Sequence, residues 1–249
     1  MNKVVLITGG SRGIGAATAV LAARRGWAVA VNYARHAEAA HAVVRRIVDA
    51  GGDAMAVQAD VAVEAQVQAM FDTVQQHWGA GLHALVNNAG VVDRPAQLAD
   101  MSGERLRRMF DINVLGSLYC AREAVRRMST RRGGAGGSIV NVSSAAARLG
   151  AAHQYVDYAA AKGAIDALTL GLAREVAPEG IRVNAVRPGL IDTEIHASGG
   201  LPDRVRELAG QVPMGRGGTA DEVAEAIVWL MSDASPYTTM SLLEVSGGR

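Results

Sequence analysis

One tyrosine–lysine pair in this sequence has a spacing that suits acid–base chemistry. Of the five tyrosines only Tyr158 has a lysine four residues further on, Lys162, and residues four apart share one face of a helix. A phenol with a pKa of about 10 is a poor base at neutral pH, but a nearby ammonium stabilises the phenolate and lowers that pKa. Lys3 is the only other lysine in an arginine-rich chain, so a compact ammonium at position 162 indicates a specific need.

Tyr155 and two serines are further polar candidates near this pair. Tyr155 is seven residues from Lys162, too far for direct contact on a helix, so we expect it to line a pocket or to pack. Ser143 and Ser144 close a strand-like segment, where a hydroxyl can hold a substrate oxygen at proton-transfer distance from a phenol. No G-x-S-x-G turn surrounds the serines, and neither is predicted to be a nucleophile.

A glycine-rich turn, Thr8–Gly15, follows the first strand-like segment and opens a helical pattern. Glycine permits positive φ and close backbone approach, and a helix N-terminus offers unpaired N–H groups to a pyrophosphate. The spacing departs from G-x-G-x-x-G because Thr18 stands where the third glycine would be. A tight structural turn is the alternative, but dinucleotide-binding folds place such a loop in the first strand–helix–strand unit, as here.

The end of the second strand bears on which dinucleotide would bind. It reads Asn32-Tyr33-Ala34-Arg35, without the carboxylate that bonds the ribose 2′-hydroxyl in NAD-binding proteins. Arg12 in the loop and Arg35 after the strand supply cations that suit a 2′-phosphate. Both could be ordinary surface arginines, but the pattern favours NADP over NAD.

Apolar runs and helical patterns alternate along the whole chain, which is typical of a parallel sheet covered by helices. The long helical pattern near 102–131 should bend at Asn113, because asparagine competes for backbone hydrogen bonds. Right-handed crossovers predict a doubly wound, Rossmann-like α/β fold in one domain, 1–249, with ligands beyond the carboxyl ends of the strands. We expect seven parallel strands, at 4–7, 28–31, 54–58, 84–86, 138–142, 182–186 and 242–245, and helices near 14–25, 38–50, 64–77, 102–131, 155–176 and 221–231.

Composition excludes several classes of function. The 25 Lys and Arg nearly balance the 24 Asp and Glu, which leaves no strong electrostatic footprint for nucleic acid. Cys120 is the only cysteine, so an intrachain disulfide and a multi-cysteine zinc site are excluded, and the six histidines have no metal-ligand spacing. No apolar run has the length of a signal-peptide core or a membrane span, and we expect a cytoplasmic protein without membrane partners.

Taken together, the motifs resemble those of the short-chain dehydrogenase/reductase family, in particular the 3-oxoacyl-carrier-protein reductase and glucose dehydrogenase group. The resemblance covers nearly the whole chain. Each motif is weak alone, but their order and intervals make a highly specific signal. The matching segments are Thr8-Gly9-x-x-x-Gly13-x-Gly15, Asp60-Val61, Asn87-Asn88-Ala89-Gly90, Asn113, Ser144, Tyr158-x-x-x-Lys162 and Pro188-Gly189-x-x-x-Thr193.

The resemblance implies an NADP-dependent oxidoreductase that acts on a carbonyl or alcohol carbon of a small molecule. Tyr158 would be the general acid or base, and Lys162 would tune it and contact the nicotinamide ribose. Ser144 rather than Ser143 would orient the substrate oxygen, and Asn113 would hold a water that relays protons to Lys162. Motifs and resemblance together give these cofactor-binding residues: Gly9, Ser11, Arg12, Gly13, Ile14, Gly15, Asn32, Arg35, Asp60, Val61, Asn88, Ala89, Gly90, Tyr158, Lys162, Pro188, Gly189, Ile191 and Thr193.

A regulatory protein that binds NADP without turnover is the alternative, and the intact Ser, Tyr, Lys and Asn set argues against it. The substrate cannot be identified from the family alone. The segment 192–213, with Gly199, Gly200 and Pro202, should form a lid over a moderately apolar site lined by Val92, Leu149, Tyr155, Ile195, His196 and Leu201. The resemblance also implies a homotetramer, whose long helices would pack through Ala121, Ala124, Ala164, Ala167 and Leu168.

Overall fold

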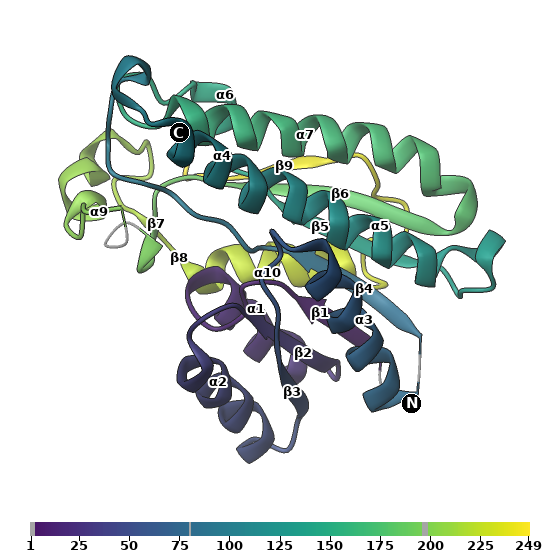
Figure 1. Ribbon diagram of the computed structural model, residues 1–249. Coiled ribbons are helices and arrows are strands. Elements are labelled where there is room, and N and C mark those ends of the chain that lie inside the picture. The colour runs from purple at the N-terminus through teal and green to yellow at the C-terminus, as the bar shows by residue number, and fades with distance from the viewer. Residues whose placement is uncertain (1–2, 80, 196–198) are drawn as a thin grey trace.

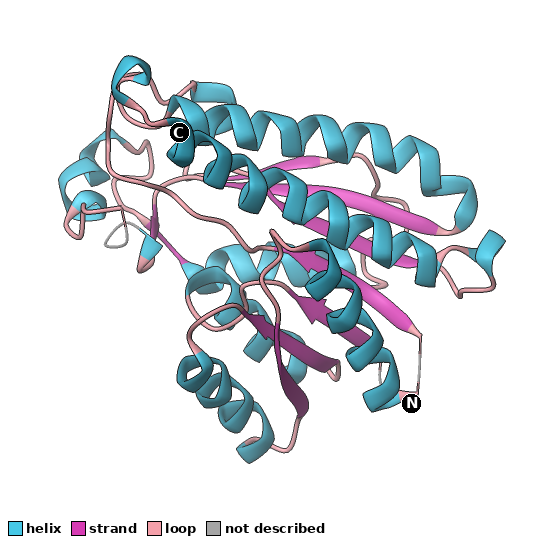
Figure 2. Cartoon of the chain, in the orientation of Figure 1, coloured by secondary structure: helices cyan, strands magenta, loops and turns pink. Residues whose placement is uncertain are grey.

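The computed structural model describes residues 3–79, 81–195 and 199–249, and a seven-stranded parallel sheet forms its centre (Figures 1 and 2). The order of the strands is β3-β2-β1-β4-β5-β6-β9, and each neighbouring pair is parallel. Winding therefore reverses between β1 and β4, which confirms the predicted Rossmann-like α/β fold. The strands are β1 (Val4–Ile7), β2 (Ala28–Tyr33), β3 (Asp53–Gln58), β4 (Leu82–Asn87), β5 (Gly137–Val142), β6 (Ile181–Pro188) and β9 (Leu242–Val245).

Helices cover both faces of the sheet, because the central strands are apolar on both sides and must be buried on both. One apolar layer joins the sheet to α1 (Gly13–Arg24), α2 (Ala37–Asp49) and α10 (Ala220–Met231). The other joins it to α3 (Glu64–Trp78), α5 (Gly116–Met128) and α7 (Val156–Val176). The elements that were not predicted include the short helices α6 (Ala146–Leu149) and α9 (Arg204–Leu208) and the paired strands β7 (Ile191–Asp192) and β8 (Gly218–Thr219).

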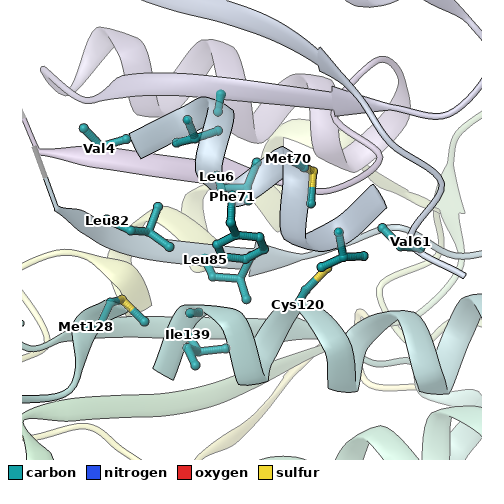
Figure 3. Packing of buried hydrophobic residues seen from close by; sticks show 14 of the residues in the cluster. Val4, Leu6, Val61, Met70, Phe71, Leu82, Leu85, Cys120, Met128 and Ile139 are labelled. Atoms are coloured by element: carbon teal, nitrogen blue, oxygen red, sulfur yellow. The ribbon is translucent and has the colours of Figure 1, made fainter. Parts of the chain in front are cut away.

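The second of these layers contains the single cysteine. Figure 3 shows Leu6 and Leu85 of the sheet packed with Phe71 of α3 and Cys120 of α5. The Cys120 thiol is fully buried, and burial raises its pKa to about 12. Cys120 is therefore a small core residue.

The predicted bend in the long helical pattern is a π-helical turn. α4 (Gly103–Phe110) ends where the π turn Asp111–Leu115 begins, and α5 follows it directly. Asn113 lies in the turn, and its side-chain amide donates to the carbonyl oxygens of Met109 (2.9 Å) and Val91 (3.1 Å). The asparagine side chain thus competes with the main chain for the Met109 carbonyl oxygen, four residues earlier, and this competition favours the irregular turn.

Part of the predicted subunit contact is wrong in detail. Ala121 and Ala124 of α5 are buried inside the monomer, with exposures of 2% and 0%, and cannot contact a second copy. They cover the sheet because their helix must bury its small-residue face against it.

Among the described residues, no helix is long and apolar enough to cross a membrane.

Candidate active site

The glycine-rich turn between β1 and α1 depends on glycine at two positions in different ways. Gly13 has φ of +53°, in the left-handed region that side chains with a Cβ rarely adopt. At Gly15 a Cβ would overlap the carbonyl oxygen of Gly9 and the side-chain amide of Asn88. Gly15 lines neither of the two cavities described below and packs closely within the turn, and the ligand contact predicted for it stays a prediction.

Two asparagines, from the strands on either side of β1, hold this turn in place. Asn32, at the end of β2, accepts a hydrogen bond from the Gly9 N–H (3.1 Å) and donates to the Ala59 carbonyl oxygen (3.0 Å). Asn88, just after β4, donates to the carbonyl oxygens of Thr8 (2.9 Å) and Gly9 (3.0 Å). The carboxyl ends of β1, β2, β3 and β4 are therefore joined by polar contacts around one loop.

A cavity of about 290 Å³ opens above this turn, and we call it the glycine-loop cavity. Arg12 and Arg35 line it, both are exposed, and neither forms an ion pair within the described residues. Asp60 and Glu194 are the carboxylates in its wall. The predicted residues that line it are Gly9, Ser11, Arg12, Gly13, Ile14, Asn32, Arg35, Asp60, Val61, Asn88, Ala89, Gly90 and Thr193.

Sequence reasoning missed several residues of this wall. Tyr33, His36, Arg108 and Ile112 also line the glycine-loop cavity. Tyr33 and His36 flank Arg35 and could have been included on that ground alone. Arg108 and Ile112 come from α4 and the π turn, and no motif marks them, because only the folding of the long helical region over the turn brings them there.

A second cavity, of about 430 Å³, contains the predicted catalytic side chains, and we call it the tyrosine cavity. Ser144 enters it from the segment after β5, and Tyr158 and Lys162 enter it from α7. Pro188, Gly189, Ile191 and Thr193 from the segment after β6 complete the predicted set. The two cavities share Ile14, Asn88, Gly90, Thr193 and Ile195 in their walls, so they adjoin.

The lysine and the phenol have opposite pKa shifts with the same cause. Lys162 is 4% exposed, and burial lowers its pKa to about 8 while Asp166 acts to raise it. Removal from water raises the pKa of Tyr158 to about 12, and its interaction with the Ser144 hydroxyl lowers it. In the phenol, desolvation therefore outweighs the interaction that favours the phenolate, and a lowering effect of Lys162 on its pKa stays a prediction.

The two adjacent serines have different environments. Ser143 is buried, and its hydroxyl donates to the Asp166 carboxylate (2.6 Å) and contacts the Lys162 carbonyl oxygen (3.3 Å). Ser144 accepts from the Ala146 N–H (3.1 Å) and interacts with the phenol of Tyr158. Ser144 is thus the serine whose hydroxyl faces the phenol.

Asn113 lies behind the cavities and lines neither. It is fully buried, and its Oδ1 accepts from the Val91 N–H (3.2 Å). A Cβ added at Gly90 would lie 2.7 Å from Asn113 Oδ1 and 3.6 Å from Lys162 Nζ. The side chains of Asn113 and Lys162 therefore both lie close to Gly90. Because glycine has no Cβ, this position leaves room for both of them.

The predicted wall of the substrate pocket is largely as expected. Val92, Leu149, Tyr155 and Ile195 line the tyrosine cavity, whereas Leu201 does not, and His196 lies outside the described residues. The lid predicted at 192–213 also includes residues 196–198, which are outside the described part of the chain. Of the remaining residues of that segment, Thr193, Ile195 and Arg204 line the cavity.

Comparison with known proteins agrees with this geometry, and the chain belongs to the short-chain dehydrogenase/reductase family. A family model described as enoyl-(acyl carrier protein) reductase matches residues 9–249. The chain is 54% identical to the uncharacterized oxidoreductase YgfF of Escherichia coli (strain K12), over 99% of each chain. It is 39% identical to a 3-oxoacyl-[acyl-carrier-protein] reductase of Staphylococcus aureus, over 100% of this chain and 98% of the relative.

A solved structure gives the same result for the fold. The crystal structure of a short chain dehydrogenase from Burkholderia cenocepacia, in complex with NADP, superimposes with a TM-score of 0.90. It is 34% identical to this chain and covers 99% of it and 97% of its own length. The predicted membership of an oxidoreductase family that uses nicotinamide cofactors is therefore confirmed.

Proposed function

We propose that the protein is an NADP-dependent oxidoreductase that interconverts a carbonyl group and an alcohol on a small substrate. The observation that carries the proposal is the position of Ser144, Tyr158 and Lys162 on one cavity that adjoins the glycine-loop cavity. Bound NADP(H) would supply or accept the hydride. The rest of the chemistry, which is proton transfer and orientation, falls to side chains of the chain itself.

Tyr158 is the proton donor when the carbonyl is reduced and the proton acceptor when the alcohol is oxidised. A phenol whose pKa lies near 12 is fully protonated at neutral pH, which suits the donor in reduction. Ser144, which faces the phenol, holds the substrate oxygen beside it. Lys162 fixes α7 against the end of β5, and Asn113 maintains the π turn behind the lysine.

The glycine-loop cavity fits a phosphorylated dinucleotide. Its turn has at Gly13 a left-handed backbone conformation that favours glycine, and it opens the N-terminus of α1 toward the cavity. Arg12 and Arg35 remain available for a 2′-phosphate, since neither is paired with an acid in the described part of the chain. We infer a preference for NADP over NAD on this basis.

Non-catalytic binding of NADP, as in a regulatory sensor, is the alternative function. Mixing the protein with NADPH and a panel of ketones and aldehydes, and following NADPH absorbance, separates the two. The proposal expects NADPH consumption that depends on the carbonyl compound and is lost in Tyr158→Phe. NADPH binding without turnover across the whole panel would instead support the sensor.

Several further expectations stay proposals. We propose one domain over 1–249, a cytoplasmic location, a cover for the substrate formed by 192–213, and a homotetramer. Exposed apolar side chains on the long helices support assembly: Leu118 on α5 is 40% exposed and Leu170 on α7 is 36% exposed. A second copy of the chain would remove these side chains from water.

A further inference from the structure

The tyrosine cavity has a cationic side chain in its wall that the proposed reaction does not use. Arg204, on α9 (Figure 1), lines the cavity together with Tyr155 and Gln154. Its guanidinium lies 5.2 Å from the centroid of the Tyr155 ring, and its Nη2 donates to the Gln154 side-chain oxygen at 2.7 Å. None of these three residues lines the glycine-loop cavity, so they belong to the substrate side of the site.

These three side chains leave hydrogen-bond donors without acceptors. A guanidinium has five N–H donors and a positive charge, so a negatively charged acceptor is its strongest partner. Across the described residues, Arg204 forms no ion pair and the Tyr155 hydroxyl has no hydrogen-bond partner. Gln154 uses its oxygen on Arg204, which leaves its side-chain NH₂ free to donate.

The charge of Arg204 is not balanced from the cavity wall. No aspartate or glutamate side chain is among the described residues that line the tyrosine cavity. Two acids close to these residues in sequence are paired with other arginines: Asp203 pairs with Arg206 (3.0 Å), and Asp157 pairs with Arg105 (2.8 Å). The field in this part of the cavity therefore favours an anion.

We infer that the substrate carries a carboxylate, which Arg204 binds with the help of Gln154 and Tyr155, while its carbonyl group lies at Ser144 and Tyr158. The inference rests on the proposed function. One guanidinium balances one negative charge, and its planar fork matches a carboxylate.

The spacing of the two tyrosines limits the substrate further. Tyr155 is the residue just before α7, and Tyr158 lies in the first turn of that helix, so the two side chains line different parts of the cavity wall. We therefore expect carbon atoms between the carboxylate beside Tyr155 and the carbonyl beside Tyr158. The apolar part of the wall, including Val92 and Leu149, would contact the carbons between them.

Matched keto acids and esters test the inference. With NADPH, the wild type should reduce 5-oxohexanoate with a KM about 10- to 100-fold below that for methyl 5-oxohexanoate. Arg204→Met should raise the KM of the acid by a similar factor and leave kcat and the KM of the ester nearly unchanged. Arg206→Met is the control, because this arginine is on the same helix but 80% exposed and paired with Asp203.

Binding of unreactive ligands decides the inference separately from turnover. Hexanoate, but not hexanamide, should stabilise the NADPH-loaded wild type against heat, and Arg204→Met should abolish that shift. If no ketone is reduced but the hexanoate shift depends on Arg204, the carboxylate site stands and the oxidoreductase proposal fails. Arg249 also lines the tyrosine cavity and is the alternative cation for the carboxylate. Equal binding of acid and amide, or loss of the shift in Arg249→Met but not in Arg204→Met, would overturn the inference.

Discussion

The Lys162 ammonium donates its hydrogen bond to the main-chain carbonyl oxygen of Val142, 2.7 Å away, and lies 5.5 Å from the centroid of the Tyr158 ring. Val142 is the last residue of β5, whereas Lys162 and Tyr158 are on α7. The lysine therefore connects the helix that carries the phenol to the strand that leads to Ser144. Its position therefore fixes how the helix and the strand are arranged in the site.

Replacing the phenol and the ammonium should have different effects on binding. Tyr158→Phe removes the proton donor and keeps the cavity wall, so activity should fall by roughly 10²- to 10⁴-fold while NADPH affinity stays close to wild type. Lys162→Ala should lower activity similarly and also weaken NADPH binding. Steady-state rates and NADPH fluorescence titrations measure both effects.

Two results test whether Tyr158 is the proton donor and Lys162 its cationic neighbour. Lys162→Arg should not restore turnover, because a planar guanidinium cannot replace a compact buried ammonium. A Tyr158→Phe enzyme with substantial reductase activity would move the proton donor to Tyr155 or to water, and the mechanism would be wrong.

The pKa of Lys162 also predicts how stability depends on pH. This pKa falls from 10.5 to about 8 on folding, so between those values the unfolded chain holds more protons than the folded one. Stability contributed by this group should therefore rise as pH increases from about 8 to 10.5. Relative to Lys162→Met, the wild type should gain about 1 to 3 kcal/mol over that range.

Urea unfolding of both proteins at several pH values from 7 to 10.5 measures this gain. Tyr158 is present in both proteins, so its own titration cancels in the difference. Lys3→Met is the control for loss of a lysine, since Lys3 is 44% exposed and paired with Asp233. A difference between wild type and Lys162→Met that does not change with pH would contradict the prediction.

The sequence predicts the fold well because each strand of the central sheet is an apolar run between turn residues. The sequence also indicates the π turn, because Asn113 competes for backbone hydrogen bonds and this competition depends only on nearby residues. The site is predictable where one short motif brings the residues together, as in Tyr158 and Lys162. β7 and β8 were missed because two-residue strands leave no periodic pattern.

Charge pairs within the site could not be predicted, since their partners are far apart in sequence. Asp166 accepts hydrogen bonds from Ser143 and from Arg187, 21 residues further along the chain. Arg105 binds Asp157 next to Tyr158 across 52 residues. No local pattern distinguishes such an arginine from the many solvated arginines of this chain, and only the fold selects the pair.

Asp166 should control the pH range in which Lys162 is charged. Its carboxylate raises the pKa of the lysine against the effect of burial, so Asp166→Asn should lower that pKa below about 8. If the ammonium contributes to NADPH binding, affinity falls as pH rises through the lysine pKa. The midpoint of this fall should move to lower pH in Asp166→Asn.

Titrations with NADPH from pH 6 to 9 locate the midpoint. Glu244→Gln is the matched control, because Glu244 binds the same Arg187 (3.1 Å) but does not act on Lys162. Damage to the structure alone would weaken binding at every pH without moving the midpoint. An unchanged midpoint in Asp166→Asn would show that the carboxylate has no electrostatic influence on the lysine.

The choice between the two nicotinamide cofactors should depend on Arg12 and Arg35. Both line the glycine-loop cavity, and no acid among the described residues pairs with either, so each can form a charge-assisted hydrogen bond with a 2′-phosphate. The wild type should bind NADPH more tightly than NADH. Arg12→Ala/Arg35→Ala should lose about 10²-fold or more in NADPH affinity and leave NADH affinity nearly unchanged, since hydrogen bonds to charged groups contribute roughly 1.5–3 kcal/mol each.

Dissociation constants from fluorescence titration measure this change in affinity. Arg46→Ala, on the exposed surface of α2, is the control for loss of a positive charge. A wild type that prefers NADH, or a double variant that loses both cofactors equally, would contradict the assignment of these arginines to the 2′-phosphate.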